Sequence, residues 1–526
     1  MSDSPDSQGH VQRGVVSAVG SIGLATLASR VLGYVRDMVV ARAFGAGPMT
    51  DAFFVAFRIP NLLRRLLAEG ALSTAVVPVF TETLTREGPE AFGRLARAVT
   101  GAAIVVLCVV AGLGALVAPL VVTVMAPGWR GDPELVMLAV TLTRALFPYL
   151  VFVGLAALAM GALNAHHRFF TAAIGPAILN LAMIVAVVSL ATRLTTPIMA
   201  LAIGVLVGGL GQLLVQLPEL HRIGVPLRPS LEWRHPAVAR IARRLWPAVF
   251  ALAAVQITVV VNTLLASLLP AGTVSYLYYA DRVMEFPLGV FGIALATAAL
   301  PSMSAQAARQ DLPALRATLE FALRLSAFVA VPATVGLLLL GGPIVQVLFQ
   351  RGEFTAAAAA LTAQALAGYA VGLPAFSATR IAAQTFYALG DTRTPVLVGF
   401  VSVMVNVVLA LVLMWPLRHT GLALASSLSS YVNVIGLCWL LRRRLGGPRG
   451  AEIWGSLGRT VVATAALALW CAWVEGRLPV VPEPVVLGLA RMVLALVGGV
   501  AVYVAMAAAI RAPELRALLG MLHTRR

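Results

Sequence analysis

The chain has 526 residues, of which 60% are hydrophobic and 12% are charged; its mean hydropathy is +0.91 and its formal net charge is +17. A soluble domain carries roughly twice that charged fraction, so the composition excludes a soluble globular protein and predicts a polytopic membrane protein. Apart from histidine, every basic residue is arginine. Arginine-rich loops and basic positions inside the membrane account for the excess, and nucleic acid is not needed to explain it.

The N-terminal segment 1–13 is polar, and no short apolar core follows a basic region within it. It is therefore not expected to be a cleavable signal peptide, and we predict a cytoplasmic tail. Apolar segments long enough to cross a bilayer as helices follow in chain order, separated by loops that contain Gly, Pro or Arg. Fourteen spans are predicted, at residues 14–43, 50–83, 98–126, 135–162, 168–192, 196–217, 238–268, 274–304, 317–349, 356–388, 394–415, 419–441, 453–474 and 484–510.

Arginine is distributed unevenly between the two sets of predicted loops. With the N-terminus inside, the inner loops include REGPEAFGRLAR, the long loop 218–237 and RRRLGGPRG, whereas the outer loops hold only isolated arginines. Because positive loops stay in the cytoplasm, both termini are predicted to be cytoplasmic, in a protein of the bacterial inner membrane.

An internal repeat relates two parts of the chain. Segments 147–184 and 373–410 match at a constant offset of 226 residues, through Pro148 and Pro374, Ala162–Leu163 and Ala388–Leu389, and Asn180 and Asn406. The offset spans six predicted helices, an even number, so both halves lie the same way up and a pseudo-twofold axis along the membrane normal is expected, with a site near the midplane between the lobes.

The predicted architecture is all-α, with two six-helix lobes and two further C-terminal helices. The boundaries are a cytoplasmic tail 1–13, an N-lobe 14–217, a cytoplasmic linker 218–237, a C-lobe 238–441, a C-terminal helical hairpin 442–510 and a cytoplasmic tail 511–526. Because the hairpin lies outside the repeat, we expect it to line a groove for a lipid tail.

The first two spans hold an unusual number of charges. One arginine at bilayer depth costs about 3 kcal/mol even on lenient insertion scales, yet five arginines occur with three acids here, not counting Arg42 and Glu82 at the span ends. Residues seven apart share a helix face, as in the pairs Arg30 and Asp37 or Asp51 and Arg58. The full set comprises Arg30, Arg36, Arg58, Arg64, Arg65, Asp37, Asp51 and Glu69.

The eighth span adds a second charged group, in YYADRVMEFP. Asp281 and Glu285 are one turn apart, with Arg282 beside Asp281. The repeat places this group in the second lobe, opposite the Arg58 region, so arginines from both lobes are expected to face one cleft.

Two interpretations of these charges can coexist. They form ion pairs that hold the lobes together, or they form a cationic cavity for a substrate bearing phosphate, pyrophosphate or carboxylate. The arginine surplus favours the cavity, because a guanidinium stays charged when desolvated and its fork fits phosphate oxygens. In the empty site, some arginines should pair with Asp37 or Glu69.

At these same residues the chain resembles a known family. The segment 29–80, SRVLGYVRDMVVARAFGAGPMTDAFFVAFRIPNLLRRLLAEGALSTAVVPVF, is similar to the N-terminal signature of the MurJ (MviN) lipid II flippases. The segment 278–304, YYADRVMEFPLGVFGIALATAALPSMS, is similar to their eighth-helix signature. The likeness extends over essentially the whole chain, including the loop FQRGEFT and the two extra C-terminal helices.

The resemblance implies the multidrug/oligosaccharidyl-lipid/polysaccharide exporter fold and translocation of the undecaprenyl-pyrophosphate-linked peptidoglycan precursor to the outer leaflet, in peptidoglycan biosynthesis and cell-wall biogenesis. Lipid II and membrane lipids are the implied partners, together with proteins of cell-wall synthesis. Near Arg380 the family carries lysine or another residue, which leaves the role of that position open. The implied substrate-binding residues are Arg30, Arg36, Asp37, Arg64 and Arg282, and the implied gating or charge-balancing residues are Asp51, Arg65, Glu69, Asp281 and Glu285.

We expect an alternating-access mechanism in which Gly45, Gly47 and Pro48 hinge an outer gate. The alternatives are a flippase of another polyprenyl-linked oligosaccharide and a cation-coupled drug exporter of the same fold, although the latter should carry net acidic charge in its lobes. An enzyme is not expected, because no paired loop carboxylates, metal-ligand spacing or nucleophile with its base occurs. No cofactor or metal is implied, and the sequence leaves open whether a coupling ion or the membrane potential drives transport.

Overall fold

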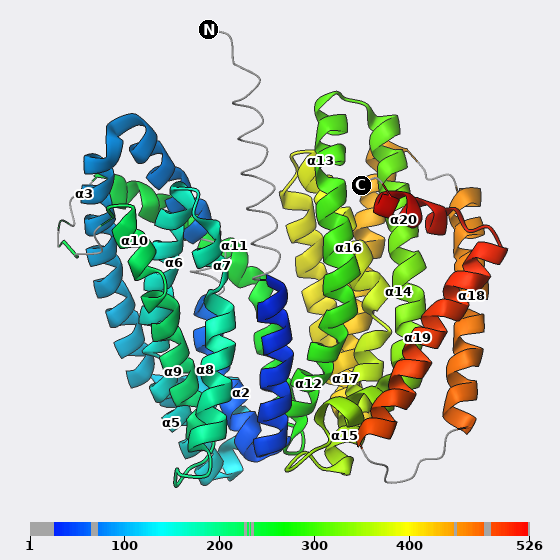
Figure 1. Cartoon of the computed structure of the whole chain (residues 1–526), viewed down its shortest axis with the longest axis horizontal. Helices are drawn as coiled ribbons and strands as arrows, with labels where there is room; N and C mark the ends of the chain where they lie inside the picture. Colours follow the sequence, from blue (N-terminus) through cyan, green and yellow to red (C-terminus); the bar gives the residue numbers. More distant parts are fainter. Residues whose placement is uncertain are drawn as a thin grey trace. The chain divides into compact units, whose positions relative to one another are not determined.

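A computed structural model of the chain describes residues 26–64, 72–225, 229–230, 232, 236–446, 450–477 and 485–523. The chain folds as two compact units, Met1–Ala271 and Gly272–Arg526. Helices make up nearly all of the described residues, and no strand occurs among them (Figure 1). The expected all-α fold is therefore confirmed.

The first unit is a bundle of long apolar helices with short connections. Its described part begins with a helix over residues 26–44. The remaining elements are α2 (Pro48–Arg64), α3 (Leu72–Leu116), α4 (Ala118–Met125), η2 (Pro127–Gly131), α5 (Pro133–Leu146), α6 (Tyr149–Ala165), α7 (Phe169–Ala173), α8 (Gly175–Leu190), α9 (Met199–Leu214), α10 (Leu217–Arg222) and α11 (Pro236–Ser267).

Close packing of α8 against α9 depends on two glycines of α9. A Cβ atom added at Gly204 would lie 2.8 Å from the Cα of Met183, and one added at Gly208 would lie 2.9 Å from the Cα of Leu179. Small residues spaced four apart let two membrane helices approach backbone to backbone. This contact fixes the position of the α8 residues between Leu179 and Met183.

A tight turn connects the helix over residues 26–44 to α2. Gly45 has a φ of 66°, in the left-handed region that suits glycine. The Thr50 hydroxyl donates to the carbonyl oxygens of Phe44 and Gly45, both at 3.2 Å. The turn therefore sets where α2 begins relative to the preceding helix.

The second unit contains the remaining elements. These are α12 (Thr273–Pro287), η3 (Leu288–Ile293), α13 (Ala294–Ala308), α14 (Leu312–Phe349), α15 (Ala356–Ala370), α16 (Leu373–Ala388), α17 (Arg393–Leu445), α18 (Gly450–Arg477), α19 (Val485–Ala509) and α20 (Pro513–His523). The element η3 is a π-helix, a rare conformation that is frequent at functional sites.

Aromatic packing anchors α12 in the second unit. Tyr279 is fully buried, and its ring centroid lies 4.9 Å from that of Phe349 and 5.3 Å from that of Phe354. Both phenylalanines belong to the FQRGEFT segment, which begins at the last residue of α14. This contact fixes the rotation of α12 about its axis and hence the direction of its charged face.

Helices α18 and α19 run side by side and pack against α14 (Figure 1). Beyond them, α20 brings Glu514 into the interior, where its side chain is 2% exposed. Glu514 Oε1 accepts a hydrogen bond from Ser456 Oγ at 2.7 Å and lies 4.0 Å from Arg324 Nε. Part of the predicted C-terminal tail is thus a helix held by a buried carboxylate.

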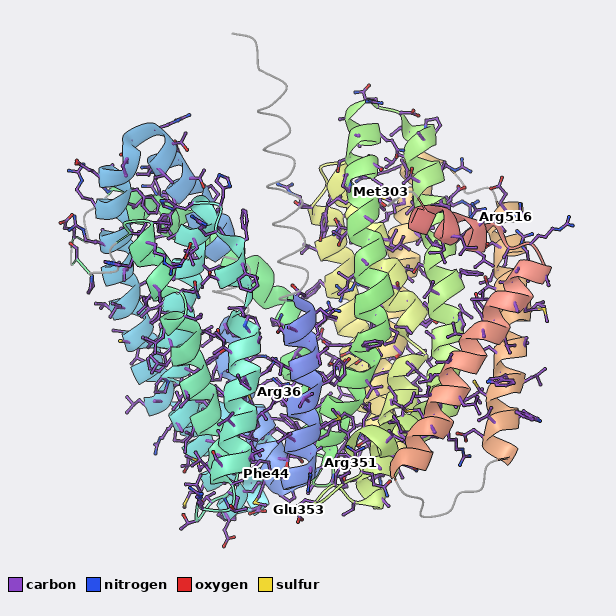
Figure 2. All side chains as sticks on the ribbon, viewed as in Figure 1. Arg36, Phe44, Met303, Arg351, Glu353 and Arg516 are labelled. Atoms are coloured by element: carbon purple, nitrogen blue, oxygen red, sulfur yellow. The ribbon has the colours of Figure 1, made fainter. Side chains whose placement is uncertain are left out.

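Several described helices have the length and apolar composition of membrane spans. Eight are long and apolar enough to cross it, or nine if the bent pair α15 and α16 counts as one span. In the second unit, Arg516 of α20 lies near one end, and Arg351 and Glu353 lie at the other (Figure 2). The predicted number of fourteen spans stays a prediction.

At two predicted loops one helix ends and the next begins directly, inside the elements labelled α3 and α17. Gly88 interrupts α3 with a φ of 85°, and Arg418 interrupts α17 with a φ of 50°. The helix α11, which is predicted to be the first helix of the C-lobe, packs on α3 and α4 in the first unit. The predicted lobe boundaries remain predictions.

Candidate functional site

Arg36 and Asp37 form a buried ion pair on the helix over residues 26–44. Asp37 Oδ1 accepts from Arg36 Nε at 2.9 Å and from Arg36 Nη2 at 2.5 Å. Arg36 is 9% exposed and Asp37 is 1% exposed. The expected pairing of an arginine with Asp37 is confirmed; Glu69 lies outside the described residues.

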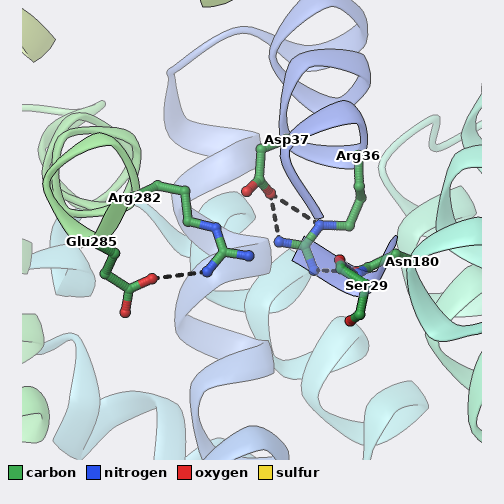
Figure 3. A network of polar contacts seen from close by, with 6 residues as sticks. All are labelled: Ser29, Arg36, Asp37, Asn180, Arg282 and Glu285. Carbon is green, nitrogen blue, oxygen red and sulfur yellow. Dashed lines mark hydrogen bonds and ion pairs between the residues drawn. The ribbon is translucent and has the colours of Figure 1, made fainter. Parts of the chain in front are cut away.

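Asn180 of α8 holds the other side of the Arg36 guanidinium (Figure 3). Arg36 Nη1 donates to Asn180 Oδ1 at 3.0 Å, and Asn180 Nδ2 donates to the Ser29 carbonyl oxygen at 3.0 Å. Asn180 is 7% exposed. Two helices far apart in the sequence therefore fix the direction of one buried cation.

The other candidate residues of the first unit lie on the same two N-terminal helices. Arg30 is exposed, whereas Asp51 is buried in the first turn of α2. Arg64 ends α2, and its Nε donates to Asn61 Oδ1 at 3.1 Å. Arg58 is half-buried between them. Arg65 lies outside the described residues.

The charged group of α12 forms a second cluster, within the second unit. Arg282 Nη1 lies 2.9 Å from Glu285 Oε2, and the two side chains are 30% and 44% exposed (Figure 3). Asp281 is half-buried on the same helix. Arg380 of α16, whose role the sequence leaves open, is exposed.

The described residues contain no group of three or more His, Cys, Asp or Glu side chains that could hold a metal ion.

The polar residue that the sequence did not assign to the site is Asn180. Its signal is visible in retrospect, because it is the one amide in an otherwise apolar membrane helix. It also occupies a repeat position, shared with Asn406.

Long apolar helices with a buried, oriented arginine define an integral membrane protein. Solved structures share this fold. A structure titled "Lipid II flippase MurJ, inward closed conformation" aligns with a TM-score of 0.78 at 24% identity, covering 93% of this chain and 98% of the other. An inward-facing multidrug resistance MATE transporter of the MOP superfamily aligns with a TM-score of 0.66 at 14% identity, covering 79% of this chain and 94% of the other.

Sequence comparisons define the family. The profile of the lipid II flippase MurJ family matches residues 40–507. The lipid II flippase MurJ of Burkholderia cenocepacia is 39% identical over 85% of this chain and 88% of its own length. The probable lipid II flippase MurJ of Vibrio cholerae is 39% identical over 78% and 80%. The chain belongs to the MurJ lipid II flippase family.

Proposed function

We propose that this protein moves lipid II from the inner to the outer leaflet of the bacterial cytoplasmic membrane. Family membership gives the substrate, and the buried Arg36 carries the physical argument. An arginine is costly inside a membrane, yet here two side chains hold its guanidinium in one orientation. A fixed guanidinium suits bidentate recognition of phosphate oxygens, and lipid II carries a pyrophosphate.

The α12 cluster is suited to exchange partners during transport. The Arg282–Glu285 pair is partly exposed, and exposed ion pairs contribute only about 0–1 kcal/mol. A pyrophosphate can therefore displace Glu285 from Arg282, and Glu285 can displace the pyrophosphate in return. We assign Glu285 to release, because a site that held the anion too tightly would not turn over.

The remaining roles follow the sequence expectations. Arg30, Arg64 and Asp37 serve substrate binding, while Asp51, Arg65, Glu69 and Asp281 balance charge or gate the pathway. The helices α18 and α19 offer a groove to the undecaprenyl tail, which stays in lipid throughout.

Transport proceeds by alternating access, with both termini in the cytoplasm and protein partners drawn from cell-wall synthesis. Gly45, Gly47 and Pro48 hinge an outer gate in this proposal, which the position of the Gly45 turn between two charged helices supports. The driving force, whether a coupling ion or the membrane potential, is not assigned.

The proposal is tested by binding of lipid II to purified protein in nanodiscs. We expect Arg36→Ala and Arg282→Ala each to weaken binding by about tenfold or more, because each removes a charge-assisted contact worth about 1.5–3 kcal/mol. Arg86→Ala is the matched control, since Arg86 is 77% exposed and pairs with Glu82 at the surface. Equal affinity in all three variants would contradict the proposal.

A further inference from the structure

Asn180 makes two hydrogen bonds that differ in direction. Its Oδ1 accepts from Arg36 Nη1, and its Nδ2 donates to the Ser29 carbonyl oxygen, each at 3.0 Å. An arginine can only donate, and a carbonyl oxygen can only accept. The amide is therefore held in one orientation, and a flipped amide would lose both bonds.

The two partners of Asn180 lie on one face of a single helix. Ser29 and Arg36 are seven residues apart, which places them on the same side about two turns from each other. The Asn180 side chain spans this face and ties the guanidinium to the backbone of its own helix. The guanidinium direction thus depends on where α8 sits.

The position of α8 is itself fixed by close packing. Asn180 lies between Leu179 and Met183, the residues whose Cα atoms touch the glycines of α9. A buried, hydrogen-bonded amide on a tightly packed helix is a rigid support for a binding group. An amide in an apolar membrane helix is costly, and such residues usually mark functional sites.

We propose that Asn180 is a positioning residue for lipid II recognition, which holds the Arg36 guanidinium in the orientation that receives the pyrophosphate. This inference rests on the proposed role of Arg36. Asn180 suits the task better than aspartate. Its amide is neutral and adds no negative charge to the one that Asp37 already places beside Arg36, whereas aspartate would add a second negative charge and could not donate to the Ser29 carbonyl.

The test compares two ligands, undecaprenyl pyrophosphate and undecaprenol, bound to protein in phosphatidylcholine nanodiscs. We expect Asn180→Leu to weaken binding of undecaprenyl pyrophosphate about tenfold, or about 1.4 kcal/mol, and to leave undecaprenol binding within about twofold. The isosteric Asn180→Asp variant should lose at least as much. It also keeps the test decisive if the leucine variant does not fold.

A merely structural role gives a different result. It would lower the melting temperature and weaken binding of both ligands alike, which would overturn the inference. The matched control is Asn406→Leu, since Asn406 occupies the corresponding repeat position, is 1% exposed and hydrogen-bonds Ser426 Oγ at 3.4 Å instead of an arginine. Its variant should keep the preference for the pyrophosphate.

Arg36→Ala separates this inference from the proposed function. If Arg36→Ala binds undecaprenyl pyrophosphate normally, the proposed role of Arg36 fails, and the role of Asn180 fails with it. If Arg36→Ala loses affinity and both Asn180 variants do not, only the Asn180 inference fails. In the double variant Arg36→Ala/Asn180→Leu, we expect no loss beyond that of Arg36→Ala, because Asn180 acts through Arg36.

Discussion

Removing the charge of Asp37 tests how Arg36 is kept in the membrane interior. In Asp37→Asn, the side chain keeps its shape but loses the carboxylate that accepts from Arg36 Nε and Nη2. Both residues are at least nine-tenths buried, so the cation that loses this carboxylate stays in a poorly hydrated environment. Breaking a buried ion pair from one side costs about 3–5 kcal/mol. Two charge-assisted hydrogen bonds of about 1.5–3 kcal/mol each give a similar range.

The assay is reversible unfolding in mixed micelles, with lipid II binding measured on the same samples. We expect Asp37→Asn to lower the free energy of unfolding by about 3–5 kcal/mol. The double variant Arg36→Met/Asp37→Leu should recover most of that loss, because apolar residues can replace a buried ion pair, and yet bind lipid II no better than Arg36→Ala. If Asp37→Asn is as stable as the wild type, or if the double variant binds lipid II normally, the reasoning is refuted.

Three further predictions concern the surrounding structure. Gly45→Ala should cost about 1–2 kcal/mol of stability, because alanine is strained at a φ of 66°; thermal unfolding should show little effect for Gly47→Ala, where an added Cβ meets nothing within 4 Å. Glu514→Ala should lower the free energy of unfolding by about 3 kcal/mol and expose α20 to proteolysis, because it leaves Ser456 and Arg324 without this carboxylate. The control Glu452→Ala, at a side chain that is 52% exposed, should lower it by less than about 1 kcal/mol. The pKa of Asp391 is lowered to about 2. The largest cause is a hydrogen bond from the Thr394 backbone N–H, followed by one from the Thr394 hydroxyl and by the Arg444 guanidinium. Because this folded-state pKa lies below the usual 3.8, the stabilisation is present above about pH 4 and is lost as the pH falls towards 2; acid unfolding of Asp391→Asn should lack this dependence.

Much of the fold follows from the sequence alone. Uninterrupted apolar runs predict membrane helices, because backbone hydrogen bonds in lipid must be satisfied within the segment. Local charge relations are also visible, as in the adjacent Arg36 and Asp37, and in Arg282 and Glu285 three residues apart. Both of these pairs occur in the structure.

Long-range contacts are harder to read from one sequence. Asn180 reaches Arg36 across 144 residues, and nothing local to either residue specifies the other. The C-terminal segment after Ala509 also contains a helix whose Glu514 is buried, although its charges predict a solvated tail. Such a carboxylate is tolerated because α14 and α18 supply Arg324 and Ser456 as partners, and these are known only once the helices are packed.

The most direct test of the central claim is made in cells in which this protein can be depleted. The quantity measured is the amount of lipid II accessible on the outer leaflet, with wild type, Arg282→Ala or the Arg86→Ala control supplied back at matched expression. We expect depletion to abolish accessibility, wild type and Arg86→Ala to restore it, and Arg282→Ala to leave it abolished. Unchanged accessibility on depletion would contradict the flippase function, and full rescue by Arg282→Ala would contradict the assignment of this arginine to the pyrophosphate.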